Sequence, residues 1–170
     1  MSRILDLALF GILTVLFLLP VSAQTAPDIP AGPVPPQILS ARKVFIANAG
    51  AESNFYNANG YVGGPNRAYN EFYAAMKDWA HYELVAAPGD ADLVFEISQR
   101  DRVVGSLPEP RLTVRIIDPK NDIAVWELST YVEVAGRVKN REKNYEIAMA
   151  KLVNDVKALV SPTPAPAAKQ

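Results

Sequence analysis

The 170-residue sequence contains no cysteine. Disulfide bonds are therefore excluded, and we expect no lipid attached to a cysteine of the kind that bacterial lipoproteins carry. Neither sign of charge dominates, because 17 basic residues face 18 acidic ones without a run of either. The basic surface typical of nucleic-acid or anionic-membrane binding is absent. The fold must then rest on its own hydrophobic core.

The sequence is equally poor in catalytic and metal-binding side chains. His81 is the only histidine, and no serine has the sequence context of a nucleophile elbow, so we expect no serine-histidine catalysis. One histidine without cysteine does not make a zinc site. Asp90-Ala91-Asp92 and Asp118–Asp122 lack the calcium-loop pattern and are typical of turns. We predict no catalytic residues, no metal and no cofactor.

The N-terminal segment has the pattern of an export signal. Arg3 gives it positive charge, an apolar run extends from Leu7 to Leu19, and Val21-Ser22-Ala23 offers small residues for cleavage. The run is shorter than the about 20 residues that cross a bilayer comfortably. We expect residues 1–23 to be a cleaved signal peptide, the alternative being a retained anchor. A second spanning stretch is lacking, so we expect no membrane insertion after cleavage and a periplasmic or secreted location.

Proline marks both edges of the region that remains. Residues 24–36 form a Pro-rich linker, and residues 161–170 form a Pro/Ala-rich tail that we expect to be disordered. Residues 37–160 are the size of one domain.

Hydrophobic patterning predicts an α+β domain. Lys43–Ala47 is a short apolar run, and apolar side chains alternate with polar ones along 93–98, 112–117 and 124–134. Residues 111–134 predict a long antiparallel hairpin that turns at Asp118–Asp122, and Glu83–Ala86 predicts a short strand. In the last strand we expect five apolar side chains on one face: Ala124, Trp126, Leu128, Val132 and Val134.

Two segments have the apolar period of a helix. Arg67–Tyr82 carries one stripe, with Asn66 as its expected N-cap, and Lys143–Val160 carries a wider stripe that ends before Ser161-Pro162. The element order is β-α-β-β-β-β-α. It predicts a mostly antiparallel sheet of four to five strands with two amphipathic helices packed on one face.

A long Gly-, Asn- and Tyr-rich loop is predicted at 49–66, longer than compact domains usually contain. Aromatic rings and amides of this kind are common in recognition surfaces, although they also fold back to cover a sheet edge. The candidate binding residues are Asn54, Phe55, Tyr56, Asn57, Asn59 and Tyr61.

Two other patterns offer weaker chemistry. Gly60–Pro65 is glycine-rich before a helix but lacks the Gly-Lys-Ser/Thr ending of a phosphate loop. A pair of carboxylates could hydrolyse a glycan, and their separation is a tertiary property. The available glutamates are Glu52, Glu96, Glu127 and Glu133, three of them at outward strand positions.

Three stretches, Asp90–Ile97, Arg111–Asp118 and Ala124–Glu127, resemble a group of periplasmic and outer-membrane-associated α/β domains. The group includes the N-terminal domain of TolB, the curli secretion component CsgG and the lipoprotein activators of penicillin-binding proteins. The resemblance implies a non-enzymatic role in docking to envelope proteins. This chain departs from those lipoproteins because it has no cysteine to acylate.

The sequence therefore predicts an exported, non-catalytic binding or scaffolding module of the bacterial cell envelope. Its expected partner is an envelope protein or polymer, contacted through the 49–66 loop. The alternative is a small envelope hydrolase that uses carboxylates on a glycan.

Overall fold

The structure is a computed structural model that describes residues 32–51, 62–104 and 107–161. The expected signal peptide, most of the Pro-rich linker and nearly all of the tail lie outside these ranges. The domain boundaries drawn from the sequence therefore stay a prediction.

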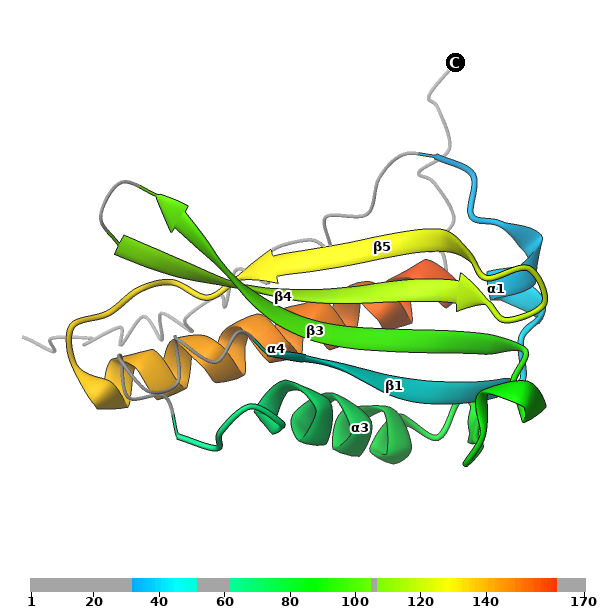
Figure 1. Ribbon diagram of the computed structural model, residues 1–170, viewed down its shortest axis with the longest axis horizontal. Helices are drawn as coiled ribbons and strands as arrows, with labels where there is room; N and C mark the ends of the chain where they lie inside the picture. The colour runs from blue at the N-terminus through cyan, green and yellow to red at the C-terminus, as the bar shows by residue number, and fades with distance from the viewer. Residues whose placement is uncertain (1–31, 52–61, 105–106, 162–170) are drawn as a thin grey trace, which may run out of the picture.

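A five-stranded mixed sheet, in the order β2-β1-β3-β4-β5, forms the centre of the molecule (Figure 1). β1 runs parallel to β2 and β3, whereas β3–β4 and β4–β5 are longer antiparallel pairs. The predicted α+β class is confirmed. The strands are β1 (Lys43–Ala51), β2 (Glu83–Leu84), β3 (Leu93–Val104), β4 (Leu107–Asp118) and β5 (Ile123–Tyr131).

β1 continues to Ala51, although the sequence places the loop from Asn48 onward. Residues 48–51 are Asn, Ala, Gly and Ala, which have low β propensity. Pairing with β3 overrides this preference: Asn48 pairs with Ile97, and Ala51 pairs with Gln99 after an irregularity. The end of β1 is therefore held in the sheet beside the middle of β3.

The predicted β4–β5 hairpin is present, and it turns at Asp118–Asp122. One strand face differs from expectation, because the register shifts between Ile116, which pairs with Trp126, and Ile117, which pairs with Ala124. The extra residue in β5 is a bulge that reverses the alternation, so Ala124 is exposed. Val134 lies beyond the end of β5 and is also exposed, not in the core.

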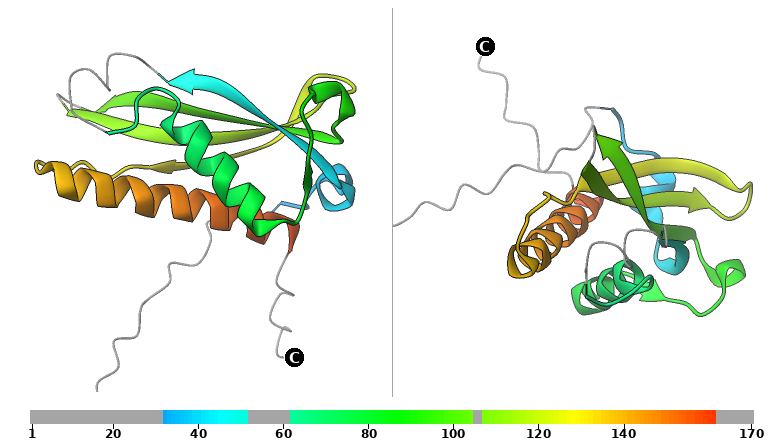
Figure 2. Two further views of the ribbon diagram at one scale, coloured as in Figure 1. Left: turned by 90° about the horizontal axis from the view of Figure 1, so that it is seen from below. Right: turned by 60° about the vertical axis from the view of Figure 1, so that its left-hand side comes forward.

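Two long helices pack on one face of the sheet, as predicted (Figure 2). α3 (Arg67–Trp79) ends at Ala80, whose left-handed φ of 52° closes it three residues before the predicted end. α4 (Val138–Val160) begins five residues earlier than predicted, because residues 138–142 are mostly polar and carry no stripe. Two short elements, α1 (Pro36–Ser40) and the 3-10 turn η1 (Pro88–Asp90), were not predicted as helical.

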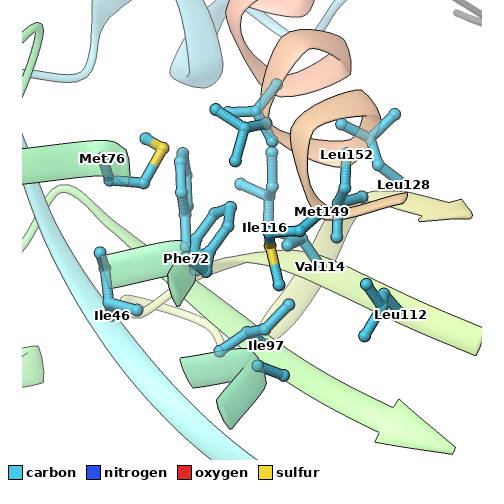
Figure 3. Close-up of a cluster of buried hydrophobic side chains, with 14 of the residues drawn as sticks. Ile46, Phe72, Met76, Ile97, Leu112, Val114, Ile116, Leu128, Met149 and Leu152 are labelled. Carbon is cyan, nitrogen blue, oxygen red and sulfur yellow. The ribbon is translucent and has the colours of Figure 1, made fainter. Parts of the chain in front are cut away.

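The core lies between the sheet and the two long helices (Figure 3). Ile46, Ile97, Val114 and Ile116 point from the strands toward Phe72 of α3 and toward α4. Because strand side chains alternate, the residues between these point to the other face, which carries neither α3 nor α4 (Figure 2). None of the helices in the described ranges combines the length and apolar character needed to cross a bilayer.

Candidate binding surface

The helix-free face of the sheet carries three rows of polar side chains, one from each of three adjacent strands. β3 contributes Glu96, Ser98 and Arg100, and β4 contributes Arg115, Thr113 and Arg111 directly opposite them. β5 adds a third member to each row. From one end to the other, the rows are Glu96–Arg115–Glu127, Ser98–Thr113–Ser129 and Arg100–Arg111–Tyr131. We call these nine residues the open face.

A hollow of about 370 Å³ lies on the open face. Ser98 and Thr113 line it together with Ala49 of β1, and these short side chains separate the charged residues on either side. Ser98 is buried and Thr113 is half-buried, so the longer neighbours stand above them. The remaining lining residues are all charged: Glu96, Arg100, Arg111, Arg115 and Glu127.

Ion pairs hold part of this charge in place. Arg115 donates to Glu96 at 3.0 Å. Arg111 donates from Nη2 to the Ser129 hydroxyl at 2.8 Å and reaches Glu127 at only 3.5 Å. The glutamates lie toward one end of the hollow and two of the three arginines lie toward the other. The surface is thus polar along its length, with an acidic end and a basic end.

The candidate residues of the 49–66 loop, Asn54, Phe55, Tyr56, Asn57, Asn59 and Tyr61, lie outside the described residues. The two ends of this loop are fixed next to each other. Asn48 donates from its side-chain amide to the side-chain oxygen of Asn66 at 2.9 Å. Asn66 occupies the predicted N-cap position of α3, but its side chain makes this bond instead of a capping bond.

Arg67 anchors the second end of the loop. It is only 8% exposed, and it binds Glu71 and Glu142, donates to the Val62 carbonyl at 3.0 Å and lies over the Tyr145 ring at 3.9 Å. The Val62 N–H donates to Glu142 at 3.1 Å. Burial lowers the pKa of the Arg67 guanidinium, but Glu71 and Glu142 more than offset it, so the net pKa is raised. Arg67 therefore remains charged and joins α3, α4 and the loop.

The glycine-rich segment has a packing role at this anchor. Gly63 has a φ of +107°, and a Cβ there would lie 2.9 Å from the Arg67 Cδ. Only glycine suits both the backbone conformation and the close approach. The described part of the segment thus seats Arg67.

The remaining sequence candidates do not form a second site. His81 lies beyond the end of α3, not in its last turn, and stacks on Trp79 at 4.6 Å. Asp92 accepts hydrogen bonds from the N–H groups of Arg42 and Lys43, and Asp118 accepts one from Lys120, so both carboxylates act in turns and strand ends. Within the described ranges, no group of three His, Asp or Glu side chains could hold a metal.

Of the four candidate glutamates, the structure brings Glu96 and Glu127 together and separates Glu133. Arg115 stands between Glu96 and Glu127 in the same row. Glu133 is exposed beyond β5, and Glu52 lies outside the described residues. The three arginines were not among the candidates, because the sequence does not reveal which strands are neighbours. Alternation alone could have placed Arg115 on the outward face, but not beside Glu96.

No family model and no curated protein matches this chain. Solved structures do match in fold. PelC from Paraburkholderia phytofirmans, described as a dodecamer, is 16% identical, with 68% of this chain and 86% of that one covered and a TM-score of 0.43. The LpoB C-terminal domain from Salmonella enterica is 14% identical over 55% and 83%, with a TM-score of 0.36. Lipoprotein GNA1162 from Neisseria meningitidis is 12% identical over 66% and 99%, with a TM-score of 0.37.

Bacterial lipoproteins are thus among the matched structures, in keeping with the resemblance to envelope lipoprotein domains at that coarse level. With identities of 16% or less and TM-scores below 0.5, we draw no functional conclusion from them.

Proposed function

We propose that this chain is a non-catalytic binding module of the bacterial cell envelope, and that its open face contacts an envelope protein or polymer. The observation that carries the proposal is the hollow on the helix-free face, where five charged side chains surround a floor of small residues. Ligand sites are typically concave and contain a few polar groups in fixed positions. The export pattern at residues 1–23 supports an envelope location.

The 49–66 loop is the second proposed contact surface. Ala49, near its beginning, lines the hollow, so the loop starts at the edge of the open face. The Asn48–Asn66 bond and the Arg67 cluster fix both ends. A loop with fixed ends loses less conformational freedom on binding, which favours recognition.

Filling the hollow tests the open face. Thr113→Trp places a bulky ring on the floor, and Asn154→Trp adds the same ring to an exposed position on α4 as the matched control. The measurement is co-sedimentation of the purified chain with isolated envelopes of the bacterium that encodes it. We expect Asn154→Trp to bind like the wild type and Thr113→Trp to bind at least about tenfold more weakly. Equal binding by all three proteins contradicts the proposal.

Replacing residues 52–61 by a Gly-Ser linker of equal length tests the loop and keeps Val62 at its anchor. We expect a partner recovered from periplasmic extract by the wild type to be lost with this variant. A partner that both proteins retain excludes the loop as a contact surface.

The hydrolase alternative is favoured by one observation, the presence of Glu96 and Glu127 in the same hollow. Glycoside hydrolysis uses two carboxylates that flank the scissile bond. Here Arg115 stands between them and pairs with Glu96. If a glycan-hydrolysing activity is detected and Glu127→Gln abolishes it, the enzyme replaces the binding module.

A further inference from the structure

The basic end of the open face places two arginines directly opposite each other. Arg100 of β3 pairs in register with Arg111 of β4, and Tyr131 of β5 completes the row. Like charges at directly opposed positions of an antiparallel pair are destabilising. An anion bound between two such side chains removes this repulsion.

Arg111 has hydrogen-bonding capacity that its neighbours do not use. Its guanidinium carries five N–H donors in a planar fork. Nη2 is engaged by Ser129 at 2.8 Å, and the contact with Glu127 is long. The buried Nε has no acceptor among the described residues. A planar carboxylate suits this fork, because it can accept two parallel hydrogen bonds.

The rest of the open face restricts the kind of anion. Ser98, Thr113 and Ser129 form a row of hydroxyls next to the arginines, and Glu96 and Glu127 beyond them can accept hydrogen bonds from hydroxyl groups. These glutamates repel a chain that carries a charge on every unit at close spacing, such as polyphosphate. The Tyr131 ring is 41% exposed and offers an apolar surface to the C–H face of a sugar ring.

We infer that Arg100 and Arg111 form a carboxylate-binding subsite for an acidic polysaccharide, whose sugar hydroxyls lie over the Ser98–Thr113–Ser129 row. The inference rests on the proposed function, since it names the ligand class of the same open face. Arg115 has a different role, because it pairs with Glu96 and stands between two glutamates. Its charge is already balanced within the protein.

The test measures the affinity of the purified chain for polygalacturonate oligomers. Arg100→Gln and Arg111→Gln are compared with Arg115→Gln, a matched change on the same face, after each variant is checked for wild-type circular dichroism. We expect the first two variants to bind about tenfold more weakly and Arg115→Gln to change by less than about threefold. We expect wild-type affinity to fall as salt is raised, because the arginines are partly exposed.

Neutral dextran and polyphosphate of matched length are the comparison ligands. Wild-type binding that is as tight to dextran or to polyphosphate overturns the assignment of an acidic sugar. Equal losses in Arg111→Gln and Arg115→Gln overturn the assignment of the subsite.

Absence of polygalacturonate binding also overturns the inference, but it leaves the proposed function standing if Thr113→Trp still releases the protein from envelopes. If Thr113→Trp has no effect there, the proposed function fails as well.

Discussion

Arg67 has the most demanding surroundings of any single residue in the described chain. Its charge is buried, and two glutamates, one carbonyl and one aromatic ring surround it. Removing one partner of a buried ion pair leaves the others uncompensated. The cost is reduced here because Glu71 and Glu142 retain some contact with solvent.

We expect Arg67→Ala to lower the free energy of unfolding by about 2–4 kcal/mol, measured by urea denaturation. Lys77→Ala, an exposed change on the same helix, should stay within about 0.5 kcal/mol of the wild type. Equal stability of the two variants would show that the cluster does not anchor the loop.

Asp92 makes folding stability depend on pH. Hydrogen bonds from the N–H groups of Lys43 and Arg42 lower the pKa of its carboxyl, which ties the start of β1 to the start of β3. A depressed pKa contributes stability that is present above the unfolded-state pKa of about 3.9 and is lost as the pH falls through the lower folded-state value.

We expect Asp92→Asn to be less stable than the wild type at pH 7, with the difference shrinking below about pH 4. The measurement is the unfolding free energy of both proteins across this range. A difference that widens toward acid pH has the wrong sign for the account.

At the scale of elements, α4 provides much of the covering layer. Leu152 is fully buried against the sheet, and Asn154, two residues later, is exposed. Truncating a buried leucine removes apolar burial and leaves a cavity. We expect Leu152→Ala to lower the free energy of unfolding by about 2–5 kcal/mol and Asn154→Ala to change it by less than about 0.5 kcal/mol, both measured by thermal and urea unfolding. Similar effects in both variants would place α4 outside the core.

Elements with strong alternation or a clear helical stripe could be predicted from the sequence. The β4–β5 hairpin and both long helices follow from local patterns that match their final surroundings. The end of β1 could not be predicted, because Asn48–Ala51 forms strand only through pairing with β3. The exposure of Ala124 depends on the bulge in β5, which side-chain alternation does not encode.

The candidate site was less predictable than the fold. Glu96 and Glu127 could be identified as outward carboxylates, but their shared row depends on the register of three strands. The pairing of Arg100 with Arg111 has the same cause, since residues between Gln99 and Pro110 carry little apolar pattern. Site chemistry in this molecule arises from tertiary register.

At the scale of the whole molecule, one face of the sheet supplies stability and the other supplies recognition. α3 and α4 cover the apolar face, and the opposite face presents the charged rows (Figure 2). The fixed ends of the 49–66 loop lie at the same sheet, with Ala49 lining the hollow. This division leaves the open face available to a ligand without disturbing the core.

The most direct test of this division is a titration of the isotope-labelled chain with solubilised envelope polymer, followed by amide NMR. We predict that the largest shifts fall on Glu96–Arg100 and Arg111–Arg115, while the amides of α3 and α4 stay in place. Shifts confined to α3 or α4 would contradict the assignment of the open face as the binding surface.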